Sequence, residues 1–203
     1  MRALHLTTLT ALVTTALITA YPSDSAAKKP AWEEVTKKKG VTVYNREIEG
    51  SGLREVKAVG IVNFPAEHIY KVVSDVDNYV EYMPYLTKVE VVKRTENHVI
   101  AYHQFDAPLV DARDYTLKLT WTEDAEKGRY KRSWRTANKQ GPGPKKGFVR
   151  VDLCNGSWTV QALGPNKSRV TYWLHTDPGG SVPTWIANKG NTISLPDLFV
   201  AVR

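Results

Sequence analysis

Residues 175–190, with the sequence HTDPGGSVPTWIANKG, mark the point at which a strand-like segment ends and a helix begins. The Asp177-Pro178-Gly179-Gly180 joint predicts a sharp turn there, because glycine adopts backbone angles that other residues resist. Pro183 suits the first turn of the helix that follows, where a backbone N–H would have no partner. Apolar residues continue at helical spacing to residue 203, and Gly190 and Pro196 predict a kinked or two-part helix.

The chain before this joint is rich in strands. Residues 31–40 have the pattern of a short helix, and β-branched alternation predicts strands at 41–48 and 53–62. A helix follows over residues 65–76, and Pro84 breaks the segment after it. Seven further strand patterns, separated by turn residues that include Asn155-Gly156, lie at 87–95, 98–106, 113–123, 128–136, 147–154, 157–164 and 168–176. Consecutive strands joined by short turns predict an antiparallel sheet, and only the helices can cover its buried face.

The first 27 residues have the pattern of a secretory signal peptide, in which Arg2 precedes an uncharged run rich in Leu, Thr and Ala. Small residues predict cleavage after Ala27 or, as the alternative, after Ala20. A membrane anchor is the competing interpretation, but the threonines make the run weakly apolar and short for a bilayer span. We therefore expect a signal peptide over residues 1–27, one domain over residues 28–203, and a secreted, periplasmic protein.

The net charge limits the classes of partner, and the cysteine content indicates what holds the domain together. The formal net charge is +7, but the lysines are scattered, so we expect solvated charges with at most a weak, transient attraction to an anionic membrane surface. Nucleic acid is a poor partner for an exported chain, and we expect a monomer. Cys154 is the only cysteine, so no intramolecular disulfide can form and a hydrophobic core must hold the domain together.

Large aromatic and polar side chains share the strand faces that should be buried. Alternation puts Arg113 on the same face as Tyr115. Two interpretations stay open: a packed core filled by aromatic rings, or a cavity whose water or ligand satisfies phenol and guanidinium groups that cost roughly 1–3 kcal/mol each when buried alone. The second gives these candidate ligand-binding residues: Met83, Tyr102, Arg113, Tyr115, Leu117, Leu119, Trp121, Tyr130, Trp134, Tyr172, Trp185, Ile186 and Phe199.

Known catalytic patterns are absent from the sequence. The histidines lack metal-ligand spacing, and there is neither a nucleophile elbow nor a phosphate-binding loop. His103 shares a strand face with Phe105, opposite Tyr102, and we expect it to be exposed or at an interface. We therefore predict a protein that is not an enzyme and that needs no metal or other cofactor.

Four stretches in a fixed order resemble the START lipid-transfer family within the wider helix-grip (SRPBCC) group. They are GVTVYNREIEGSGLREVKAVGIV (40–62), SDVDNYVEYMP (74–84), PLVDARDYTLKL (108–119) and RVTYWLHTDPGGSVPTWIANK (169–189). The resemblance covers about residues 32–203. It implies an α+β helix-grip fold, in which a curved antiparallel β-sheet wraps around a long C-terminal α-helix and encloses an apolar cavity for one lipid or sterol-sized ligand.

One position departs from the family pattern. Sterol-carrying relatives keep a second buried arginine six residues after the arginine of the Arg-Asp-aromatic motif, whereas this chain has Leu119 there. The ligand is therefore expected to be wholly apolar or to be anchored elsewhere.

We expect a secreted carrier that binds one lipid or other hydrophobic small molecule for transport or sequestration. A polyketide cyclase/aromatase-like enzyme of the same fold is one alternative, and a ligand-free interaction module is favoured if the interior is filled. Arg113 should point inward and meet either a ligand or, as an equal alternative, Asp111 or Asp106. The final helix should press Trp185, Ile186, Ile193 and Phe199 onto the sheet, as a movable lid or as a permanently docked helix.

Overall fold

The computed structural model describes residues 30–108 and 110–203, and the predicted signal peptide, residues 1–27, lies outside the described residues. Within the described part of the chain, no helix has both the length and the apolar character needed to cross a membrane.

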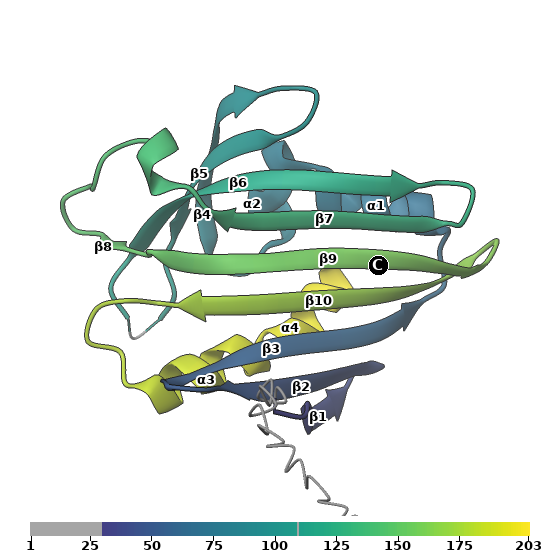
Figure 1. The fold of residues 1–203 in the computed structure, drawn as a ribbon, viewed down its shortest axis with the longest axis horizontal. Helices are drawn as coiled ribbons and strands as arrows, with labels where there is room; N and C mark the ends of the chain where they lie inside the picture. The colour runs from purple at the N-terminus through teal and green to yellow at the C-terminus, as the bar shows by residue number, and fades with distance from the viewer. Residues whose placement is uncertain (1–29, 109) are drawn as a thin grey trace, which may run out of the picture.

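A single antiparallel sheet forms the body of the protein (Figure 1). Its strands lie in the order β1-β2-β3-β10-β9-β7-β6-β5-β4, and the two-residue β8 pairs in parallel with β6. Because β3 pairs with β10, the first and last parts of the chain meet in the middle of the sheet. The strands span Glu33–Lys38 (β1), Val41–Ile48 (β2), Ser51–Val62 (β3), Leu86–Arg94 (β4), Val99–Phe105 (β5), Arg113–Asp124 (β6), Arg129–Thr136 (β7), Val149–Arg150 (β8), Leu153–Gly164 (β9) and Lys167–Asp177 (β10).

The main helices lie on one side of this sheet, behind it in Figure 1. Helix α1 packs on β7, β9 and β10, whereas α3 and α4 pack on β2 and β3. The helical segments span Ala66–Ser74 (α1), Val76–Asn78 (η1), Tyr79–Tyr82 (α2), Asn138–Gln140 (η2), Thr184–Ile193 (α3) and Leu195–Ala201 (α4). The predicted α+β architecture, an antiparallel sheet gripping a C-terminal helix, is confirmed.

The joint that precedes the C-terminal helix has the geometry that its sequence predicts. Gly179 and Gly180 have φ values of +66° and +68°, a region that favours glycine. The Asp177 side chain accepts a hydrogen bond from the Gly179 N–H at 2.9 Å, which holds the turn. The predicted two-part helix is also confirmed, because Ser194 ends α3 and precedes α4.

Two local predictions are wrong. Residues 31–40 do not form a helix, because Glu33–Lys38 pairs along β2 as an edge strand, and this pairing overrides the weak helix preference of its Glu and Lys residues. Asn155-Gly156 is not a turn, since β9 runs straight through it. A Cβ atom at Gly156 would lie 2.2 Å from Cζ2 of Trp134, so glycine is required there for close packing of the indole ring.

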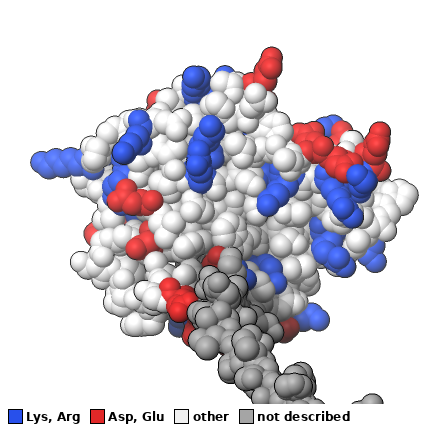
Figure 2. Space-filling model, in the orientation of Figure 1, with Lys and Arg blue, Asp and Glu red and all other residues white. Residues whose placement is uncertain are grey.

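The core lies between the sheet and its helices. Trp158, Phe199 and Ile69 are its largest fully buried side chains. On the opposite face, which Figure 2 shows, Lys and Arg side chains are spread among acidic ones rather than gathered in one patch, in agreement with the scattered lysines of the sequence.

Candidate functional site

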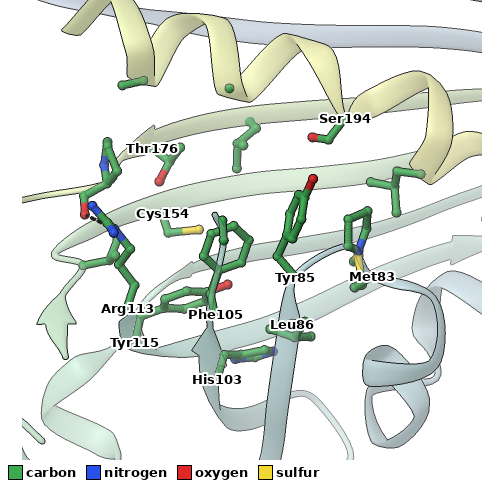
Figure 3. A pocket seen from close by; sticks show the side chains of 18 of the residues that line it. Met83, Tyr85, Leu86, His103, Phe105, Arg113, Tyr115, Cys154, Thr176 and Ser194 are labelled. Carbon is green, nitrogen blue, oxygen red and sulfur yellow. Dashed lines mark hydrogen bonds between the residues drawn. The ribbon is translucent and has the colours of Figure 1, made fainter. Parts of the chain in front are cut away.

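A pocket of about 470 Å³ lies between the sheet and the C-terminal helices. Its walls come from the segment after α2, from β4, β5, β6, β7, β9 and β10, and from α3 and α4. Figure 3 shows the side chains that point into it, with Arg113, Tyr115, Cys154 and Thr176 toward one end and Met83 toward the other. The lining is mostly apolar, as is usual for small-molecule sites.

Eight of the thirteen candidate residues line this pocket. Their side chains come together from three strands (β6, β7 and β10), from α3 and from the segment after α2, which strand alternation alone could not join. They are Met83, Arg113, Tyr115, Leu117, Leu119, Trp134, Tyr172 and Ile186. Leu119, the position that departs from the sterol-type pattern, is buried at the pocket wall. Their role as ligand contacts stays a prediction.

Three of the other candidates share the correct side of the sheet but lie where helices fill the space. Tyr130 stacks on Tyr70 of α1, with ring centroids 5.0 Å apart. The guanidinium of Arg132 lies 4.8 Å from the centroid of the Trp121 ring. Phe199 is fully buried, and its ring centroid is 5.5 Å from that of Trp158.

Trp185 does not face the sheet, contrary to prediction. Its side chain is 67% exposed and lines a shallow hollow beside the β2–β3 turn. Ile186 and Ile193 reach the pocket but are themselves 37% and 62% exposed. The apolar residues of α3 are therefore divided between the pocket and the solvent.

The prediction of which face of β5 points into the pocket is wrong. Tyr102 does not line the pocket, and its hydroxyl donates to Asp114 at 2.9 Å. His103, predicted to be exposed or at an interface, is buried, lines the pocket and stacks on Tyr115 with ring centroids 5.3 Å apart. Strand β5 is buried on both faces, so alternation could not distinguish them. The missing signal was the register, which pairs His103 with the inward-facing Tyr115.

Burial keeps most polar groups in the pocket uncharged. It lowers the pKa of His103 to about 4, and Nδ1 of this histidine lies 3.1 Å from the Ala101 carbonyl oxygen. Burial also raises the pKa of the Cys154 thiol to about 11 and those of the Tyr115 and Tyr172 phenols further above their ordinary value. At neutral pH these groups offer hydrogen bonds but no charge.

Arg113 is the one charged side chain among the described residues that line the pocket. It is 3% exposed, and its guanidinium donates to the carbonyl oxygens of Pro178, at 3.3 Å, and of Asp111. The alternative ion pair with the Asp111 or Asp106 carboxylate does not form. The inward direction predicted for this side chain is confirmed.

The acidic neighbour in the motif has a separate role on the other face of the sheet. Asp114 is fully buried and forms two hydrogen bonds of 2.8 Å with Arg150, whose guanidinium also donates to the carbonyls of Pro142 and Gly143. This ion pair fixes the loop before β8 and engages the carboxylate of Asp114, the residue next to Arg113 in the chain. Among the residues described, no cluster of His, Cys, Asp or Glu is suited to hold a metal ion.

Comparison with known proteins identifies the family. A family model described as "Polyketide cyclase / dehydrase and lipid transport" matches residues 62–199, more than half of the chain. The chain belongs to this family. The START-like resemblance noted in the sequence is thereby confirmed.

Three relatives of this START-like chain are informative. The crystal structure of a STAR-related lipid transfer protein from Xanthomonas axonopodis has a TM-score of 0.75 and 29% identity, over 85% of this chain and 96% of that one. The mouse phosphatidylcholine transfer protein is 25% identical over 182 residues, 85% of this chain and 84% of its own length. Mouse START domain-containing protein 10 is 24% identical over 81% of this chain, which spans 57% of that longer protein. The helix-grip fold is therefore confirmed.

Proposed function

We propose that this protein is a carrier that takes one lipid or other hydrophobic molecule from a membrane, holds it in the pocket and releases it chemically unchanged. The observation that carries the proposal is the mostly apolar pocket of about 470 Å³ under α3, in a fold shared with lipid transfer proteins. Its size falls within the roughly 300–1,000 Å³ that is usual for small-molecule sites. Each methylene group transferred from water into such a pocket contributes about 0.8 kcal/mol.

The hollow interior weighs against a ligand-free interaction module, which would be favoured by a filled core. The family description also includes polyketide cyclases, so a cyclase-like enzyme is the alternative that an experiment must separate. The uncharged state of His103 and Tyr115 at neutral pH supports binding, because these groups can donate or accept hydrogen bonds without carrying charge into an apolar pocket.

Mass spectrometry of organic extracts tests the carrier proposal. Protein purified from its own host should yield one hydrophobic molecule per chain. Leu117→Trp should lose this ligand, because the larger ring would occupy the pocket that Leu117 lines. Leu163→Trp is the matched control, since Leu163 is 44% exposed near the end of β9 and lies outside the pocket.

The same preparation separates the alternatives. Incubation with long-chain lipids and with polyketide-like chains should return each compound unchanged. A cyclised product formed in a saturable manner would establish the enzyme instead. Failure of every hydrophobe to bind would favour the interaction module.

We also propose that the carrier is exported and acts as a monomer, with transient membrane contact during loading. The Arg2 start and the small residues before positions 20 and 27 support export. N-terminal sequencing of protein from the periplasm of the host should show a new terminus after Ala20 or Ala27. Soluble cytoplasmic protein that keeps Met1 would contradict this proposal.

A further inference from the structure

The chemistry around Arg113 narrows the class of ligand, an inference that rests on the carrier function proposed above. A guanidinium has five N–H donors in a planar fork. Arg113 directs Nε to the Pro178 carbonyl and one terminal nitrogen to the Asp111 carbonyl, and both acceptors are neutral. Further donors stay available at a side chain that is 3% exposed and faces the pocket.

In the part of the chain that the structure describes, the charge of Arg113 has no acidic partner. Within residues 30–108 and 110–203, no carboxylate lies within salt-bridge distance of Arg113. Asp114, its neighbour in the chain, is already bound on the opposite face by Arg150. A buried charge without a partner is costly, so a counter-ion from outside the chain is strongly favoured here.

A second buried arginine differs from Arg113 in its position and not in its charge balance. Among the described residues, Arg132 also lacks an acidic partner, and its buried Nε has no hydrogen-bond partner. Arg132 lies under the α1 end of the sheet and is placed over the Trp121 ring, away from the pocket. Arg113 has no such aromatic partner and lines the pocket next to Thr176 and Cys154 (Figure 3). Its position under the Asp177–Gly180 joint puts the charge at one end of an otherwise apolar space.

We propose that Arg113 binds the anionic oxygen atoms, carboxylate or phosphate, of an amphiphile whose hydrocarbon part fills the rest of the pocket. The planar fork suits either group, since guanidinium forms paired hydrogen bonds with carboxylate and with phosphate. The ligand then lies with its charged end under the joint and its apolar end toward Met83. The chain's departure from the sterol-type pattern at Leu119 is consistent with this, because the pocket keeps one cationic anchor instead of an arginine–acid pair.

Three probes with the same chain length test the proposal: hexadecanoate, hexadecyl phosphate and hexadecanol, each titrated at 0.15 M and about 0.5 M salt. The wild-type protein should bind at least one anion about ten- to hundredfold more tightly than the alcohol, as expected for hydrogen bonds to a charged group. The preference should persist at the higher salt, because a buried pair is screened far less than a surface pair. Which anion is preferred distinguishes a carboxylate from a phosphate ligand.

Arg113→Gln should lower the affinities for the two anions to about the affinity for hexadecanol, since glutamine keeps hydrogen-bond donors but has no charge. Arg169→Gln, at an exposed position on β10, should leave all three affinities unchanged. Equal wild-type affinities for the anions and the alcohol would overturn the inference alone, and this comparison needs no variant to fold. An anion preference that survives Arg113→Gln would overturn it too. Failure of all three probes to bind would overturn the carrier proposal itself.

Discussion

The two halves of the C-terminal helical segment have opposite relations to the sheet. In α4, Leu195, Leu198 and Phe199 are at most 5% exposed. The Phe199 ring fills the space next to Gly60, where a Cβ atom would lie 2.9 Å from its Cδ1. In α3, Trp185 and Ile193 are 67% and 62% exposed, and the helix lies over the pocket. One half is part of the core, and the other half covers a hollow.

Because of this difference, we assign anchoring of the C-terminal segment to α4 and opening of the pocket to α3. Burial of large apolar side chains holds α4 in place, whereas α3 contributes few such contacts and is the half with the lower cost of local opening. Ser194, between the two helices, and the glycine joint before Pro183 provide the ends about which α3 could swing. We infer that a ligand enters and leaves by displacement of α3 while α4 stays docked.

The largest expected effect is on stability, and it should fall on one half only. Phe199→Ala should lower the free energy of unfolding by about 3–5 kcal/mol, because it removes a fully buried ring and leaves a cavity. Trp185→Ala should change it by no more than about 0.5 kcal/mol, since this ring is mostly in solvent. Urea unfolding followed by circular dichroism measures both. Similar losses in the two variants would break the comparison between the helices.

The next effect concerns His103, which lines the pocket that α3 covers. The pKa of His103 is about 4 in the folded protein and about 6.5 in the unfolded chain, so the unfolded chain binds the proton more readily. The part of the free energy of unfolding that depends on neutral His103 is fully present above pH 6.5. It is lost as the pH falls from about 6.5 to about 4. The loss should reach roughly 3 kcal/mol, because one pKa unit corresponds to about 1.4 kcal/mol.

Unfolding midpoints measured between pH 7 and pH 4 test this dependence. His103→Gln should remove most of it, because glutamine does not titrate. An unchanged pH profile in that variant would mean that the loss of stability in acid comes from groups other than His103.

The sequence predicts the architecture better than it predicts the details of the pocket, and the reasons are physical. Strand alternation, the Asp177–Gly180 joint and Pro196 are local signals, and each led to the correct element. Residues 31–40 were misassigned because pairing with β2, a non-local contact, decides their structure. The Asn155-Gly156 prediction failed because the glycine makes room for Trp134 from the neighbouring strand.

The pocket depends on register and on which helix covers which part of the sheet. His103 and Tyr102 were exchanged because β5 is buried on both faces and only its pairing with β6 shows which face is inward. Tyr130 and Trp121 have the predicted direction but lie at the α1 end, where the space is filled. Neither fact is encoded within a single strand, so the sequence pattern could not supply it.

A disulfide across α3 and the sheet tests the gate directly. A Cβ atom at position 52 would lie 3.7 Å from the Cβ of Thr184, within the roughly 3.5–4.5 Å that disulfides require. In the variant G52C/T184C, the oxidised protein should transfer a pyrene-labelled fatty acid between vesicles at least about tenfold more slowly, a barrier increase of about 1.4 kcal/mol. The reduced form of the same variant is the control and should keep the wild-type rate. Cys154 should not interfere, since burial raises its pKa.

Equal rates in the two redox forms would rule out α3 as the gate and favour a permanently docked helix. The reciprocal experiment locks α4 to the sheet in the same way. A transfer rate that falls only when α4 is locked would make α4 the gate and α3 the anchor.

The smallest effect distinguishes a helix that swings as a unit from one that loosens internally. Gly190 lies inside α3, and a Cβ atom there would meet nothing within 4 Å. Gly190→Ala should therefore raise the free energy of unfolding by about 0.5–1 kcal/mol, because alanine loses less backbone entropy in a helix. If loosening at Gly190 contributes to opening, release of the pyrene-labelled fatty acid should slow by no more than about fivefold, the factor that corresponds to about 1 kcal/mol. Gly164→Ala, at another open position at the end of β9, should leave release unchanged. Release that stays at the wild-type rate in a stabilised Gly190→Ala protein would place the hinge at Ser194 and the glycine joint alone.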